Sequence, residues 1–204
     1  MTADEAFEAF DRGDWTEAER LYRARLAEAS GTDAEQSPMH MLAFTLAMKG
    51  EFEEAIGLYG ELLRRAGEQD AAEDIAVAMH QLGMTCRLAG DSRKARAWFE
   101  QELEFRKDRL PDDQTGFSAN SYEFGELDLL EGESEKALAH FRLALRQGKA
   151  AGDDICTGCA WRGIGKASRV MHHDPTTAWE LALDAFRRAG DKAGEAEIRR
   201  MIGK

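Results

Sequence analysis

The stretch that decides the fold is Gly13-Asp14-Trp15-Thr16-Glu17-Ala18, a six-residue motif that recurs along the chain. The later copies read GEFEEA at 50–55, GDSRKA at 90–95 and GESEKA at 132–137. Their glycines are separated by 37, 40 and 42 residues. A period of this length is typical of arrays of stacked helix pairs.

The chemistry of the motif predicts two helices joined by a tight turn. The glycine tolerates the left-handed conformation that ends one helix, and the Asp, Glu or Ser after it can cap the next. The closing alanine is small because the two helices cross closely there, and an aromatic residue follows four positions later: Tyr22, Tyr59, Phe99 and Phe141. An apolar residue and a small one precede each later glycine at helical spacing, as Leu42-Ala43, Leu82-Gly83 and Phe124-Gly125.

A fifth, less regular unit contains Trp161, Ile164-Gly165 and Ala178, with the turn His172-His173-Asp174-Pro175 between its helices. Proline suits the first turn of a helix, so Pro175 predicts a helix start. A short helix after Asp191, rich in Glu and Arg, is suited to end such an array in water.

These residues resemble the tetratricopeptide repeat family, in particular its kinesin-light-chain-like subtype of about 40 residues per repeat, and small bacterial proteins of that family. The resemblance covers nearly the whole chain and implies an all-α, right-handed superhelical α-solenoid of about five antiparallel helix pairs with a C-terminal capping helix. We expect one domain over 1–204, with repeats near 1–32, 34–67, 69–109, 112–151 and 153–189 and a cap over 191–204. Segments 69–74 and 110–115 are expected to be connectors.

The amino-acid composition limits the kinds of partner that the chain is expected to bind. The chain has 27 basic and 39 acidic residues, a net charge of -12, which repels a phosphate backbone. Nucleic acid and anionic membranes are therefore not expected partners. The first five residues lack the basic and apolar regions of a secretory signal, and three cysteines do not suggest a disulfide framework. These features predict a cytoplasmic protein.

The family resemblance implies that the first helix of each pair lines a concave groove. Counting back fifteen residues from the motif's alanine, and allowing for an insertion in the fifth unit, locates one groove position per repeat. The following turns of the same helices supply the rest. The predicted groove residues are His40, Phe44, His80, Met84, Arg87, Tyr122, Glu126, Arg162, Lys166 and Arg169.

This predicted groove is apolar at its N-terminal end, where Phe7 and Phe10 contribute, and basic at its C-terminal end. It favours a peptide or protein segment, or an amphiphilic small molecule with an anionic group, bound without a cofactor. Two alternatives stay open. The groove's histidines, Tyr122, Glu126 and Arg162 could serve a small-molecule enzyme, or the acidic outer face could make the chain an adaptor for a basic partner. Trp98 and Trp179 could belong to the core or to the seam of a homodimer.

Two smaller motifs suggest no chemistry. Cys156-Thr157-Gly158-Cys159 lacks the preceding strand of a redox motif and the two further ligands of a zinc site, so we expect these thiols to pack at a helix start. His172-His173 is expected to be an exposed turn. No catalytic residue, metal site or cofactor is predicted.

Overall fold

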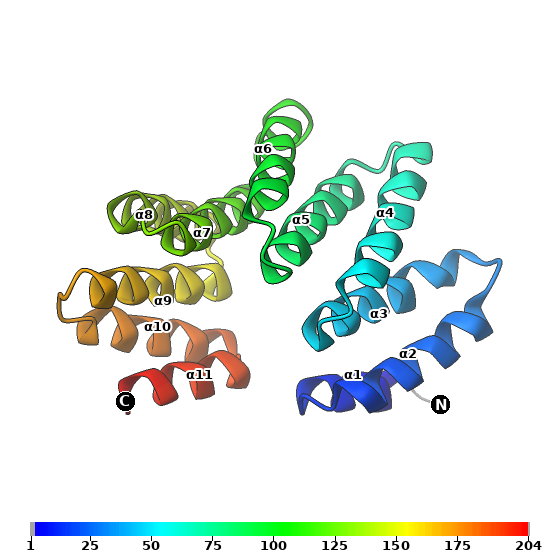
Figure 1. Cartoon of the computed structure of the whole chain (residues 1–204), viewed down its shortest axis with the longest axis horizontal. Coiled ribbons are helices and arrows are strands. Elements are labelled where there is room, and N and C mark those ends of the chain that lie inside the picture. The colour runs from blue at the N-terminus through cyan, green and yellow to red at the C-terminus, as the bar shows by residue number, and fades with distance from the viewer. Residues whose placement is uncertain (1–2, 204) are drawn as a thin grey trace. The chain divides into compact units, whose positions relative to one another are not determined.

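The computed structural model describes residues 3–203, whose contacts divide the chain into two compact units, one up to Glu102 and one from Leu103 onward. Within residues 3–203 every regular element is a helix, which confirms the predicted all-α class (Figure 1). Unit 1 contains α1 (Ala3–Asp11), α2 (Trp15–Ala29), the short 3-10 helix η1 (Asp33–Glu35), α3 (Gln36–Lys49), α4 (Phe52–Glu68) and α5 (Ala72–Leu88). Unit 2 contains α7 (Gln114–Leu130), α8 (Ser134–Ala151), α9 (Asp154–Val170), α10 (Thr176–Ala189) and α11 (Lys192–Ile202). Helix α6 (Ser92–Arg109) contains the boundary.

Helices adjacent in sequence pack together within each unit, which confirms the predicted pairs α1–α2, α3–α4, α7–α8 and α9–α10, and α11 packs on α10 as the expected cap. The first helices of successive repeats also touch, α3 with α5 in unit 1 and α7 with α9 in unit 2. Surfaces built from successive first helices therefore exist in both units. That the two units act as one domain stays a prediction.

The turn glycines behave as predicted. Gly13, Gly50, Gly90 and Gly132 all have positive φ, between 75° and 90°. The residue after the glycine caps the next helix only where it is aspartate: Asp14 accepts from the backbone N–H of Glu17 and Asp91 from that of Lys94. Glu51 and Glu133 form no such bond, because glutamate is one methylene too long to be a favoured cap.

The core follows the repeat. The alanines that close the motif are completely buried, and the aromatic residues four positions later are at most 2% exposed. A Cβ atom on Gly83 would lie 2.5 Å from the ring of Phe99, and one on Gly125 would lie 2.5 Å from that of Phe141. The small residue predicted before each turn is thus required by an aromatic ring of the following helix.

One predicted boundary is wrong. The connector expected at 69–74 ends at residue 71, since α5 begins at Ala72 and includes Glu73 and Asp74 in its first turn. The connector at 110–115 is nearly right, because α6 ends at Arg109 and α7 begins at Gln114. In the fifth unit His172 adopts the left-handed conformation that glycine has in the others, with φ of 59°.

Candidate ligand-binding surfaces

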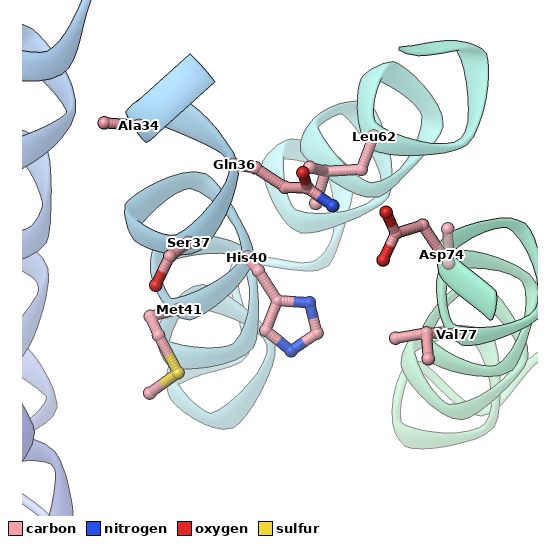
Figure 2. Close-up of a pocket in the computed structure, with 9 residues that line it drawn as sticks. Ala34, Gln36, Ser37, His40, Met41, Leu62, Asp74 and Val77 are labelled. Atoms are coloured by element: carbon pink, nitrogen blue, oxygen red, sulfur yellow. The ribbon is translucent and has the colours of Figure 1, made fainter. Parts of the chain in front are cut away.

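A pocket of about 440 Å³ lies in unit 1 where α3 approaches α5; we call it the α3–α5 pocket. Figure 2 shows the His40 ring pointing from α3 toward α5, where Asp74 and Val77 face it, with Gln36 directed toward the same carboxylate. The pocket is lined by Ala34, Gln36, Ser37, His40, Met41, Leu62, Asp74, Val77 and Ala78. Its walls therefore combine an apolar surface with four polar side chains.

Three of these polar side chains have no partner among the described side chains. Among the side chains that the structure describes, which leave out those of residues 1–4, 33 and 204, no hydrogen bond or ion pair is formed by Gln36, Ser37 or Asp74. Gln36 and Ser37 are exposed at the start of α3, and Asp74 is half-buried in the first turn of α5. All three line the pocket, and in Figure 2 the Gln36 amide and the Asp74 carboxylate point toward each other, whereas the Ser37 hydroxyl points to the other side of α3.

His40 is the one predicted groove residue that lines this pocket. Its half-buried ring packs edge-on against Tyr59, with 5.6 Å between ring centroids. Burial lowers the pKa of His40 below its usual 6.5, outweighing the opposite effect of the Asp74 carboxylate. At neutral pH the imidazole is therefore uncharged, and it leaves the charge of Asp74 uncompensated.

The other predicted residues of unit 1 lie outside the pocket. His80 places its Nδ1 atom 3.0 Å from a carboxylate oxygen of Glu102, which is fully buried. Phe44 packs on Phe10, with ring centroids 5.2 Å apart. Met84 and Arg87 are half-buried further along α5. These side chains contribute more to packing and internal pairing than to an open site.

In unit 2 the predicted residues meet one another across α7 and α9. The Nη2 atom of Arg162 donates to the hydroxyl oxygen of Tyr122 at 2.9 Å, and its Nη1 atom donates to Glu197 of α11 at 2.5 Å. The Nζ atom of Lys166 lies 3.0 and 3.1 Å from the two carboxylate oxygens of Glu126.

Arg169 completes this set by lying over the ring of Trp179, 5.4 Å from its centroid. Counting by repeats thus identified side chains that do face one another, but each predicted cation is engaged by a group of the protein itself. Burial also raises the pKa of Tyr122 well above its usual range, so its hydroxyl stays neutral. An anionic ligand would have to displace Glu197 or Glu126, and anion binding here stays a prediction.

The groove predicted from the sequence does not include most of the α3–α5 pocket. The groove count began at His40 and His80 and ran only toward the C-terminal ends of the helices. Extending it one turn the other way reaches Gln36 and Ser37 on α3 and Val77 on α5, which line the pocket. Asp74 was missed for a different reason, because the polar run around it was interpreted as a connector.

The structure also shows the surroundings of the two smaller motifs, the cysteine pair of α9 and the histidine pair before α10. Cys156 and Cys159 are free thiols in the first turns of α9, and burial raises the pKa of Cys156 to about 12 and also raises that of Cys159. Both are thus poor nucleophiles at neutral pH. His172 and His173 are exposed in the turn before α10. The described residues contain no group of three or more His, Cys, Asp or Glu side chains arranged to hold a metal ion.

Among the described helices, none combines the length and the apolar character needed to cross a bilayer.

Comparison with known proteins agrees with this architecture. Residues 35–108 match the tetratricopeptide repeat family. This segment is built of tetratricopeptide repeats. No curated protein sequence matches the chain. Among solved structures, kinesin-light-chain TPR-like repeats from Podosopora anserina are similar, with a TM-score of 0.61 at 16% identity, covering 96% of this chain and 93% of that one.

Two further structures share the repeat fold. PlcR of Bacillus thuringiensis, solved in complex with the peptide PapR7 and DNA, has a TM-score of 0.76 at 15% identity and covers 96% of this chain and 71% of its own. A Rap protein complexed with competence and sporulation factor has a TM-score of 0.66 at 14% identity, covering 96% of this chain and 60% of its own. At such identities these likenesses show the fold alone. The fold of these tetratricopeptide repeats therefore extends beyond the matched segment.

Proposed function

We propose that this tetratricopeptide-repeat protein is a peptide-binding module, and that the α3–α5 pocket receives a side chain of the bound segment. The observation that carries the proposal is a pocket with apolar walls, lined by described polar side chains that have no hydrogen-bond or ion-pair partner. The pocket lies on the surface that the first helices of the repeats form in unit 1. Asp74 is the half-buried member of this set of side chains, and a folded protein rarely leaves a buried polar group without a partner unless water or a ligand completes it. A volume of about 440 Å³ is within the range of ligand sites.

One comparison and two properties of the chain favour a peptide over other ligands. PlcR, of similar fold, was solved with a bound peptide. A surface made of successive first helices is also open along the helix pair, which suits a chain segment better than an enclosed metabolite. The net charge of -12 disfavours nucleic acid for this chain.

We propose binding and not catalysis. Of the residues that could have formed an acid, base and anion clamp, His40 and His80 belong to unit 1, and Tyr122, Glu126 and Arg162 belong to unit 2. In unit 2 the titratable groups are bonded to one another, and in unit 1 His80 faces a buried glutamate. In neither of these two arrangements does a histidine share an open space with a second titratable group. Such a pair does occur in the α3–α5 pocket, which is lined by His40 and Asp74.

The test is a selection of random twelve-residue peptides displayed on phage against the full chain, followed by measurement of the affinity of a selected synthetic peptide. Ser37→Trp fills the pocket from an exposed position at the start of α3. We expect this variant to bind about tenfold or more weakly, a loss of roughly 1.4 kcal/mol or more. The matched control is Thr177→Trp, an exposed hydroxyl residue at the same second position of α10 in unit 2.

The two variants separate the site from general effects. Parent-like binding by Thr177→Trp together with the loss in Ser37→Trp supports the proposal. If the Ser37 variant binds as tightly as the parent, the peptide binds elsewhere and the pocket assignment is wrong. If no peptide sequence is enriched over a bare support, peptide binding itself is contradicted.

A further inference from the structure

We infer that the α3–α5 pocket selects a cationic side chain, lysine or arginine, whose charged end pairs with Asp74 and whose methylene stem lies on the apolar wall. This inference rests on the proposed function and deepens it. It reverses the charge preference that the sequence suggested, because the predicted cations of unit 2 are already paired and the open pocket is acidic.

Asp74 differs from two other half-buried carboxylates of unit 1, Glu19 and Glu35. Glu19 and Glu35 have side chains that are 16% and 13% exposed, and each is ion-paired, with Lys49 and with Arg65. Asp74 is also half-buried but forms no ion pair or hydrogen bond within the part of the chain that the structure describes. A partly desolvated carboxylate gains more from a bound cation than a fully solvated one.

The described part of the pocket also lacks a competing cation. No lysine or arginine is among the described residues that line the pocket. The adjoining pocket, which shares Gln36 and Leu62, contains Arg65, but this guanidinium donates to Glu35 at 2.5 Å and to Glu61 at 2.7 Å. The neutral His40 does not supply a positive charge either. The local charge that a ligand meets is therefore negative.

The remaining walls of the pocket fit the shape of such a side chain. Leu62 is buried, Val77 is 41% exposed and Met41 is half-buried, so they offer apolar area on which a stem of three or four methylenes can lie. Lys and Arg bury such stems while their charged ends stay near polar groups. In Figure 2 the nitrogen of the Gln36 amide lies toward the Asp74 carboxylate and its oxygen points away, so the carboxylate itself is the acceptor offered to an ammonium or guanidinium.

A simpler role for Asp74 has to be separated from this one. As an acidic residue in the first turn of α5, it also favours the helix start through the helix dipole. Glu73 is in the same first turn, is exposed, and does not line the pocket. Replacing either residue by its amide removes one negative charge from the same helix end, but only Asp74→Asn removes it from the pocket.

The experiment repeats the phage selection on the full-length parent, on Asp74→Asn, on Glu73→Gln and on Asp74→Lys. Lysine or arginine is expected to be enriched at one position of the peptides selected by the parent and by Glu73→Gln. That enrichment should disappear with Asp74→Asn and change to aspartate or glutamate with Asp74→Lys.

A parent-selected peptide is then resynthesised with its basic residue replaced by citrulline, which has the shape of arginine without its charge. The citrulline peptide should bind the parent about fivefold more weakly, as expected of one partly exposed charge pair, and bind Asp74→Asn as well as the charged peptide does.

The outcomes distinguish this inference from the proposed function. If peptides are enriched and Ser37→Trp abolishes their binding, but no basic residue recurs or it persists with Asp74→Asn, the cation preference is overturned and the peptide site stands. The same holds if the citrulline peptide binds the parent unchanged. If no peptide is enriched at all, both the cation preference and the proposed peptide-binding function are contradicted.

Discussion

At the scale of single residues, the helical glycines differ in what their missing side chain allows. A Cβ atom on Gly83 would lie 2.5 Å from the ring of Phe99, which is completely buried. Gly57, inside α4, would place a Cβ atom in open space. The first glycine is therefore needed for helix packing, whereas the second only weakens its helix.

We predict opposite effects for Gly83→Ala and Gly57→Ala. The first should destabilise the protein by about 1–3 kcal/mol, because the added methyl overpacks the contact with Phe99. The second should stabilise it by about 0.5–1 kcal/mol, because alanine is a better helix former. Urea unfolding followed by circular dichroism measures both, and a destabilised Gly57→Ala or a neutral Gly83→Ala would contradict this account.

At the scale of elements, α11 is a cap that covers the apolar face of α10. Ile198 of α11 is completely buried against a cluster that includes Trp179 and Phe186 of α10. The start of α11 is fixed by Asp191, which accepts from the backbone N–H of Gly194. Glu197 extends the cap to α9 by pairing with Arg162. Without α11, the buried aromatic side chains of α10 would face water.

Replacing Ile198 by alanine tests this covering role. We expect Ile198→Ala to lower the free energy of unfolding by about 2–4 kcal/mol, since it leaves a cavity against Trp179 and Phe186. The matched control is Ile202→Ala on the same helix, where the side chain is 44% exposed. That variant should stay within about 0.5 kcal/mol of the parent. Equal effects of the two variants in urea unfolding would mean that α11 does not act through its buried face.

At the scale of the whole molecule, the question is whether the two units unfold together. Helix α6 runs without interruption from Ser92 to Arg109 and so contributes residues to both units. In repeat proteins, cooperativity depends on such nearest-neighbour elements. A destabilised repeat in one unit should therefore lower the stability of the other if they form one domain.

We predict that Leu82→Ala, at a buried position in α5 of unit 1, shifts the unfolding midpoint of both units equally. The expected destabilisation is roughly 2–5 kcal/mol. Fluorotryptophan labels report on each unit separately, since Trp15 and Trp98 lie in unit 1 and Trp161 and Trp179 in unit 2. Leu181→Ala, at a position 38% exposed, is the control that should shift neither pair. If the urea midpoint shifts only for the labels in unit 1, the two units are independent domains.

The repeat pattern in the sequence was sufficient to predict the helix pairs, their turns and the small residues between them. These features depend on local chemistry: a glycine that accepts positive φ, an aspartate that caps the next helix, and a small residue beneath an aromatic ring. The same pattern placed Tyr122 and Arg162, and Glu126 and Lys166, on facing helices, each pair 40 residues apart.

Only the tertiary structure decided which of these charges remain available to a ligand. Arg162 and Lys166 have basic side chains typical of an anion site, but their partners come from α7 and α11, and spacing along one helix cannot reveal them. Asp74 lies in a polar run that suggests a loop, yet the packing of α5 against α3 turns it toward His40 in a shared pocket. The helices follow from short-range preferences, whereas the free charge of a binding site depends on long-range pairing, which forms only when the helices pack.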